Sequence, residues 1–232
     1  MSGRYARGVL TDADIAPVAA LLGDPARARI VQALHDGRAL PAGELARRAQ
    51  VAASTASEHL ARLVDGKLVA VERSGRHRYF RLASADVAHA VEALAVLSPE
   101  RAPRSLREAA IGDALAEART CYDHLAGKLG VAVAETLLER DAVVEAEGGF
   151  AIGRALDATL RDWGVAPLPP RRRPVLRCID WSERRPHVAG ALGAALCTRA
   201  LEAGWVERLP TSRAVRLTPS GRRALAALGV SL

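Results

Sequence analysis

Side chains able to bind a metal or to undergo thiol chemistry lie in the second half of the chain. Cys121 and His124 fall one turn apart on the predicted helix SLREAAIGDALAEARTCYDHLAGKLG, so both can face one site. The segment CIDWSERRPH adds Cys178, Asp180 and His187. Sulfur, nitrogen and oxygen ligands in this mixture suit zinc or another soft metal, and a pair of thiols can instead react with an oxidant. The sequence therefore predicts a metal-sensing or thiol-sensing site.

Several of these residues also have a purely structural interpretation. The pattern from Asp180 to Glu183 matches the capping box of an ordinary helix. Cys197 falls in the apolar row of its predicted helix, which favours a place in the core. The three cysteines are widely spaced and form no CxxC pair, which argues against a disulfide framework or a zinc ribbon and predicts reduced thiols.

An organic effector is a competing interpretation. Most of the few aromatic residues lie in the second half of the chain, and core packing explains them equally well. They are Tyr122, Trp163, Trp181 and Trp205. Arg184, Arg185 and His187 are available to bind an anion beside them.

Catalytic motifs are absent from the sequence, which contains no HExxH, GxSxG or P-loop pattern. The spaced glycines of GGFAIGRA fall in a predicted hairpin turn and not in a strand-to-helix phosphate loop. We therefore expect the protein not to be an enzyme.

The stretch STASEHLARLVDGKLV (54–69) opens a predicted helix with small hydrogen-bonding groups. These are the hydroxyls of Ser54, Thr55 and Ser57 and the imidazole of His59. A helix inserted in the major groove presents its N-terminal turn to base edges and phosphates, and such side chains suit that position. A capping box formed by Thr55 and Glu58 is the structural alternative, but it explains neither His59 nor the basic hairpin that follows.

The neighbouring elements complete a winged helix-turn-helix. A short helix opened by Pro41 and a tight turn precede this stretch, and a two-stranded hairpin and a closing helix follow it. The predicted helices cover 14–23, 25–36 and 84–97, and the hairpin strands cover 68–72 and 77–82. Residues 54–82 contain six basic and three acidic side chains, a surplus of three positive charges where phosphates would be met. The predicted DNA contacts are Gln50, Ser54, Thr55, Ser57, His59, Arg62, Arg73, Arg76, His77 and Arg78.

The remainder of the chain repeats one plan. Residues 130–165 and 193–230 each read as helix, strand, turn, strand, helix, and the proline-rich segments 99–105 and 166–174 are predicted connectors.

Composition favours a soluble globular protein with an anionic partner. The chain has 232 residues, half of them hydrophobic, and a net charge of +7. All but two of its 33 basic residues are arginine, so part of this charge can reflect genomic base composition, and we give it little weight alone. The start MSGRYARGVL lacks an apolar signal region and no run is long enough to span a membrane, which predicts a cytoplasmic location without membrane partners.

Residues 22–83 closely resemble the winged-helix domain of ArsR/SmtB-type bacterial transcriptional repressors. The opening LGDPARARI, the helix STASEHLARL and the wing GRHRYFRL carry the resemblance. It implies a homodimer paired through its first and fifth helices, with two recognition helices about 34 Å apart on a pseudo-palindromic operator. The usual Cys-x-Cys metal site before the recognition helix is missing here. On the closing helix, Asp86, His89 and Glu92 are too incomplete for a tetrahedral site and are expected to form a solvated face.

These observations predict a mainly α protein with small β-hairpin wings (α+β). We expect a DNA-binding and dimerisation domain at 1–98 and an effector-sensing or interaction domain at 99–232, with winged-helix-like repeats at about 105–165 and 175–232. The predicted function is a homodimeric transcriptional repressor that releases a double-stranded operator when a metal, an oxidant or a small organic effector binds. An unregulated architectural DNA-binding protein is the alternative, and the repeats can instead bind a protein partner.

Overall fold

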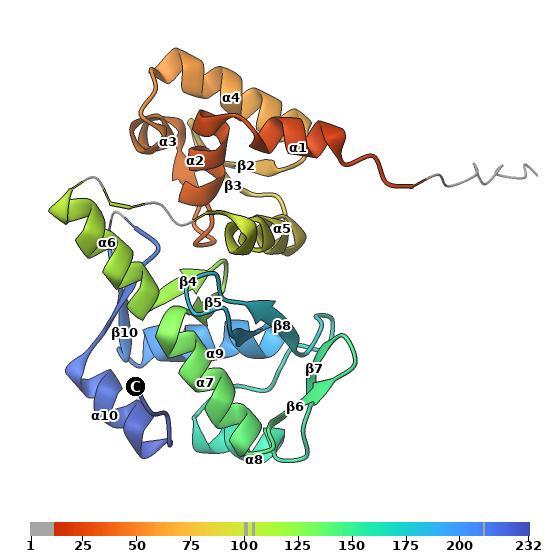
Figure 1. Ribbon diagram of the computed structural model, residues 1–232, viewed down its shortest axis with the longest axis vertical. Coiled ribbons are helices and arrows are strands. Elements are labelled where there is room, and N and C mark those ends of the chain that lie inside the picture. The colour runs from red at the N-terminus through yellow and green to blue at the C-terminus, as the bar shows by residue number, and fades with distance from the viewer. Residues whose placement is uncertain (1–11, 100–101, 104, 211) are drawn as a thin grey trace, which may run out of the picture.

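The computed structural model describes residues 12–99, 102–103, 105–210 and 212–232 (Figure 1). The first part of the chain contains five helices and three strands among its described residues. They are α1 (Ala16–Leu22), α2 (Pro25–Ala33), β1 (Leu40–Pro41), α3 (Ala42–Ala49), α4 (Ala53–Asp65), β2 (Val69–Ser74), β3 (His77–Leu82) and α5 (Ala85–Leu97). The predicted winged helix-turn-helix is confirmed.

Local sequence signals set the ends and the buried faces of these helices. The Asp24 carboxylate accepts hydrogen bonds from the backbone N–H groups of Ala26 and Arg27, both at 2.9 Å, so α2 begins after Asp24. The helix α4 buries Ala56, Leu60 and Leu63, one stripe of an amphipathic helix. Leu60 and Leu63 pack into the first hydrophobic cluster of the molecule.

The wing is an antiparallel hairpin within a three-stranded sheet of order β1-β3-β2. Val69 pairs with Leu82 at its base and Ser74 with His77 at its tip, and Gly75 turns the chain there with φ of 57°. A left-handed conformation of this kind favours glycine. The hairpin predicted with strands at 68–72 and 77–82 is confirmed.

The second part of the chain runs twice through hairpin, helix, hairpin and helix. After α6 (Leu106–Glu117), the first pass contains β4 (Arg119–Cys121), β5 (His124–Ala126), α7 (Gly127–Glu139), β6 (Val143–Ala146), β7 (Gly149–Ile152) and α8 (Leu156–Asp162). The second contains β8 (Leu176–Ile179), β9 (Pro186–Ala189), α9 (Gly190–Glu202), β10 (Val206–Arg208), β11 (Val215–Leu217) and α10 (Pro219–Ala227). The winged-helix-like character of these repeats stays a prediction.

The predicted single helix over 105–130 is wrong. The chain leaves α6 at Ala118, where the backbone becomes extended, and then forms the β4-β5 hairpin. This stretch is hydrogen-bonded to a segment far along the chain. Thr120 N–H donates to the Arg213 carbonyl at 2.9 Å, and Val215 N–H donates to the Ala118 carbonyl at 3.0 Å. Pairing with a segment so far along the chain overrides local helix propensity.

The two repeats are packed into each other. The helix α7 contacts β9 of the second repeat, and α9 contacts β5 of the first. A second hydrophobic cluster joins Leu129, Trp163 and Leu192 with Cys197, which confirms Cys197 as a core residue. Burial raises the pKa of the Cys197 thiol to about 11, so it stays protonated near neutral pH.

The predicted linker at 99–105 lies partly outside the described residues, as does the N-terminal segment 1–11. The domain boundary after residue 98 therefore stays a prediction. Among the described helices, none has the length and apolar character needed to cross a bilayer.

Candidate functional site

The N-terminal turns of α4 are presented to solvent. Ser54 and Ser57 are exposed and Thr55 is half-buried. Ser57 Oγ donates to the Ala53 carbonyl at 2.9 Å. The helix begins at Ala53, with Ala52 as N-cap, so the alternative capping box at Thr55 is wrong. Gln50, exposed and left-handed with φ of 58°, ends α3 and forms the tight turn between the two helices.

His59 is placed differently from the other predicted DNA contacts. Its side chain is only 15% exposed, and its Nε2 lies 3.9 Å from the Asp24 carboxylate at the start of α2. The imidazole therefore faces α2 and does not lie on the side of α4 that carries the exposed serines. We leave His59 out of the proposed base-reading surface for this reason.

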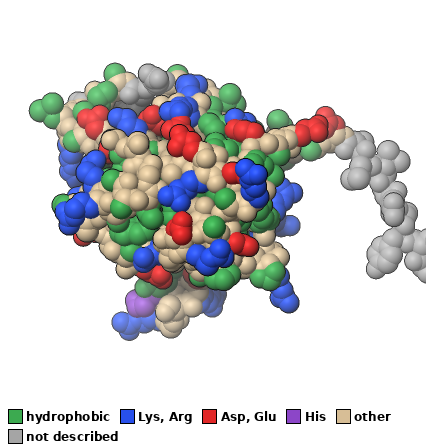
Figure 2. All heavy atoms as spheres, turned by 90° about the horizontal axis from the view of Figure 1, so that it is seen from below, with side chains coloured by type: hydrophobic (Ala, Val, Ile, Leu, Met, Phe, Trp, Pro, Cys, Tyr) green, Lys and Arg blue, Asp and Glu red, His purple; other side chains and the backbone are tan. Residues whose placement is uncertain are grey.

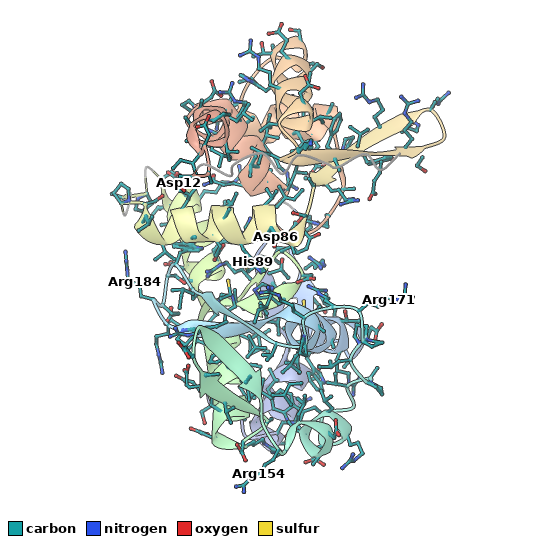
Figure 3. The ribbon with its side chains drawn as sticks, turned by 90° about the vertical axis from the view of Figure 1, so that its right-hand side faces the viewer. Asp12, Asp86, His89, Arg154, Arg171 and Arg184 are labelled. Carbon is teal, nitrogen blue, oxygen red and sulfur yellow. The ribbon has the colours of Figure 1, made fainter. Side chains whose placement is uncertain are left out.

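The wing carries the basic part of the candidate interface. Arg62 on α4 and Arg73, Arg76, His77 and Arg78 on the hairpin are all exposed. The Arg78 guanidinium lies 5.4 Å from the centre of the Phe80 ring. Figure 3 shows the hairpin projecting from the body of the molecule with its long side chains spread along it.

The end of the molecule seen in Figure 2 has a different charge distribution from that of the wing. Figure 2 views the molecule from below Figure 1 and shows basic and acidic side chains interspersed on that face. The wing, by contrast, has four basic or imidazole side chains within the six residues from 73 to 78. A phosphate backbone is better matched by such a local surplus than by a mixed surface.

A second candidate site lies in the interior, where the hairpins β4-β5 and β8-β9 meet. Each hairpin supplies a cysteine and a histidine that face each other across its strands, Cys121 with His124 and Cys178 with His187. All four side chains are buried, and one ligand atom from each lies within 4.8 Å of the other three. The two histidine Nε2 atoms are 3.1 Å apart. The residue types predicted from the sequence are therefore brought together, by hairpin pairing and not by one helix.

Asp180 lies beside this cluster and not among its ligand atoms. Its carboxylate accepts the Gly127 N–H at 2.6 Å and the N–H groups of Ser182 and Glu183, and it pairs with Arg119 at 2.9 Å. Residues 181–183 form a turn, so the predicted helix-capping role of Asp180 is wrong. Burial opposes ionisation of this carboxyl, but the charge of Arg119 and these hydrogen bonds hold its pKa below the ordinary value.

Burial also disfavours a charged His124. The neighbouring Cys121 and Asp123 outweigh this effect and raise the pKa of His124 to about 9. The imidazole Nδ1 faces the Asp123 carboxylate at 3.3 Å, and Arg172 pairs with the same carboxylate at 2.5 Å.

A buried charged network connects the cluster to the first part of the chain. His35, which follows α2, places Nε2 3.1 Å from Glu92 of α5 and 3.6 Å from the Cys121 sulfur. Glu92 also pairs with Arg119 at 3.1 Å and with Arg213 at 3.3 Å. Burial would raise the pKa of Glu92, but the hydrogen bond from His35 and the two arginines hold it far below its usual range.

The expected solvated face of α5 is therefore wrong at Glu92, which is 1% exposed. Asp86 is exposed, as expected. His89 lies on the side of α5 turned toward the second part of the chain (Figure 3), with its ring centre 6.3 Å from that of His124. Burial lowers the pKa of His89.

Sequence reasoning missed Asp123, His35 and Arg119, and it placed Glu92 on a solvated face. A signal for Asp123 was available, because Cys-x-Asp and His-x-Ala-Gly occur in both repeats, first as CYDHLAG and then as CID and PHVAG. No comparable pattern links His35 with Glu92 or Arg119, which are distant in sequence and meet only through the fold.

The aromatic residues considered for an organic effector are distributed over different surroundings. Trp163 belongs to the second hydrophobic cluster, and the partly buried Trp205 packs against it. Trp181 instead lies against the Arg119 guanidinium, 4.8 Å from the ring centre. His187 faces His124 in the interior, whereas Arg184 and Arg185 are exposed.

Comparisons with known proteins concern the part of the chain that carries the first of these two sites. A family model described as a helix-turn-helix domain matches residues 22–72. The HTH-type transcriptional regulator YdfF of Bacillus subtilis (strain 168) is 44% identical over 214 residues, which cover 91% of this chain and 95% of that protein.

Two solved structures each match a little more than a third of the chain. The homodimeric winged helix-turn-helix domain of Mb0332 from Mycobacterium bovis is 30% identical over 36% of this chain and 76% of its own, with a TM-score of 0.34. The transcriptional repressor BigR from Xylella fastidiosa is 26% identical over 38% of this chain and 88% of its own, with a TM-score of 0.35.

Proposed function

Because the chain belongs to the helix-turn-helix family of transcriptional regulators, we propose that it is a homodimeric, sequence-specific repressor that an effector releases from its operator. The observation that carries the proposal is the exposed N-terminal turn of α4 beside a projecting basic wing. In this arrangement α4 enters the major groove, while Arg73, Arg76 and Arg78 meet phosphates along the backbone. Repression follows from the resemblance of residues 22–83 to ArsR/SmtB-type repressors. We place this activity in the cytoplasm.

Dimerisation is supported by exposed apolar side chains on the helices that the resemblance implicates. Every residue of α1 is at least partly exposed, and α5 leaves Leu94 and Leu97 in contact with solvent. Most of the large apolar side chains that are exposed in the described part of the chain lie at α1, α5 or α6. These are Ile15, Val18, Leu94, Leu97, Leu106 and Ile111. A second copy of the chain would remove this surface from water.

Effector control is supported by the buried cysteine-histidine cluster. Cys121 belongs to this cluster and also contacts His35 of the DNA-binding part, so a change at the cluster has a physical path to α2 and α5. Metal, oxidant and small-molecule effectors are all compatible with such a path.

The test is fluorescence anisotropy of the purified chain on DNA from immediately upstream of its own coding region, with scrambled DNA as control, across a salt titration. A repressor is expected to prefer one upstream sequence by about a thousandfold or more. Equal binding to both DNAs would support the architectural alternative, and failure to bind at low salt would overturn the assigned DNA interface.

A further inference from the structure

The buried cluster has the composition and the spacing of a tetrahedral metal centre. Two nitrogen ligands about 2.0–2.1 Å from a tetrahedral Zn²⁺ are roughly 3.3 Å apart. The Nε2 atoms of His124 and His187 are 3.1 Å apart, and the sulfurs of Cys121 and Cys178 lie in the same 4.8 Å group. Small movements of these side chains are enough to admit an ion between them.

Carboxylates stand behind both histidines. The Nδ1 atom of His124 is 3.3 Å from Asp123, and the Nδ1 atom of His187 is 3.7 Å from Asp180. In metal sites a histidine typically donates the N–H of its second ring nitrogen to a carboxylate. When that nitrogen is Nδ1, this hydrogen bond fixes the tautomer in which Nε2 is free to bind the metal. The first repeat provides this hydrogen bond. In the second, the carboxylate lies beyond hydrogen-bonding distance, and the Nδ1 atom of His187 has no hydrogen-bond partner among the described residues. The two Nε2 atoms nevertheless face the same place, 3.1 Å apart.

A glycine on α9 allows His124 to come this close. A Cβ atom on Gly193 would lie 2.3 Å from the Val188 carbonyl and 2.9 Å from the Cβ of His124. A Cβ atom on Gly130 would lie 2.5 Å from the Leu125 carbonyl and 3.7 Å from the Cβ of His187. Gly193 therefore leaves room on α9 for His124, whereas at Gly130 the close neighbour is the Leu125 carbonyl and His187 is at ordinary contact distance.

The ligand set selects the class of ion. Two thiolates with two imidazoles in a tetrahedral arrangement are typical of Zn²⁺, whereas Mg²⁺ and Ca²⁺ require oxygen ligands. Four protein ligands, all buried, also leave no open position for water, as in structural zinc sites.

We propose that Cys121, His124, Cys178 and His187 bind one Zn²⁺ ion that joins the hairpins β4-β5 and β8-β9. Asp123 orients His124, and Asp180 lies 3.7 Å from the Nδ1 atom of His187. His35 Nε2 lies 3.6 Å from the Cys121 sulfur and 3.1 Å from the Glu92 carboxylate, so its N–H group is shared between the bound thiolate and the nearer carboxylate. The site itself stands on this geometry, while any effect of the ion on operator binding rests on the proposed function.

The site is tested with the full chain purified under reducing conditions without chelators. We expect about one equivalent of zinc per chain by mass spectrometry of the metal. After removal of the zinc, titration with Co²⁺ should give the intense visible bands of a tetrahedral ion and a thiolate-to-cobalt charge-transfer band. A protein that is purified without zinc and gives no such spectrum with Co²⁺ would overturn the proposal. A disulfide between Cys121 and Cys178 that persists under the reducing conditions of purification would also overturn it.

Variants identify the ligands. Cys121→Ser and Cys178→Ser should each weaken the charge-transfer band, whereas Cys197→Ala, which changes a buried cysteine outside the cluster, should leave the cobalt spectrum unchanged. Asp123→Asn changes a partly exposed carboxylate and is expected to weaken metal binding by about 10-fold to 100-fold. If a cysteine variant does not fold, metal binding by Asp123→Asn and the cobalt spectrum of the wild type still test whether the cluster binds the ion. A full-strength spectrum in both serine variants would overturn the assignment.

Operator binding by the same samples is measured in parallel by anisotropy. Loss of operator preference with an intact cobalt spectrum counts against the proposed function alone. Absence of metal with intact operator binding counts against the metal site alone.

Discussion

At the scale of single residues, Arg76 at the tip of the wing shows how one side chain contributes to DNA affinity without reading sequence. We expect Arg76→Ala to weaken binding to operator and scrambled DNA alike and to reduce the slope of log affinity against log salt by about one. A salt titration followed by anisotropy measures both. Arg154→Ala is the matched control, because Arg154 is 90% exposed and follows β7, outside the winged helix. An unchanged slope in Arg76→Ala would remove the tip of the wing from the DNA interface.

Asp24 is a second residue whose role is set by its immediate neighbours. As the N-cap of α2 it accepts two backbone hydrogen bonds, and Asp24→Ala should lower the free energy of unfolding by about 1 kcal/mol. Asp24→Asn keeps the cap and should cost less. The backbone hydrogen bond from Arg27 leads the effects that hold the pKa of Asp24 below its ordinary value. The contribution of the ionised carboxylate to the free energy of unfolding is therefore present above the unfolded-state pKa and is lost as pH falls through the folded-state pKa. Urea denaturation at several pH values measures this loss.

At the scale of elements, a buried carboxylate of α5 pairs with arginines of the second part of the chain. Glu92 pairs with Arg119, Arg213 and His35, and removing its charge leaves buried positive groups without their partner. We expect Glu92→Gln to lower the free energy of unfolding by about 3–5 kcal/mol in urea denaturation. Asp86→Asn on the exposed side of the same helix is the control and should change it little. Equal stability of the two variants would contradict the role assigned to the network.

The elements also show what the sequence alone can predict. The winged helix-turn-helix was predictable because its signals are local: the cap at Asp24, the apolar stripe through Leu60 and the turn at Gly75. The stretch from 118 to 126 was not, because its extended form depends on Arg213 and Val215, distant along the chain. The ligands Cys121, His124, Cys178 and His187 could be named by residue type, but their geometry required the hairpins. The link through His35 and Glu92 exists only in three dimensions.

At the scale of the whole molecule, the exposed apolar surface predicts the oligomeric state. Leu97 is 81% exposed at the end of α5, and we expect Leu97→Glu to shift a dimer toward the monomer because it places a charge in an apolar interface. Light scattering coupled to size-exclusion chromatography measures the mass. Ile152→Glu, at an exposed apolar position of β7 outside this surface, should remain dimeric. A wild-type protein that is monomeric at all concentrations would contradict the proposed dimer.

The proposed ion and the DNA-binding surface are expected to be coupled through Cys121 and His35. If zinc occupancy changes the packing of these residues, its removal should change operator affinity by about 5-fold to 150-fold, the usual range for coupled sites. Anisotropy with zinc-loaded and zinc-depleted protein measures the effect. Cys197→Ala should respond to zinc as the wild type does. An identical operator affinity with and without zinc would show that the ion supports the fold without regulating DNA binding.

The division of the cluster between two hairpins also has a consequence during synthesis. His124 and His187 are 63 residues apart, so at about 5–20 residues per second the second histidine is added roughly 3–13 s after the first. By then the winged helix has already been translated, and the nascent chain carries Cys121 and His124 as half of a site. The complete cluster can assemble only after β9 has left the ribosome, which makes its formation one of the late steps in the maturation of the protein.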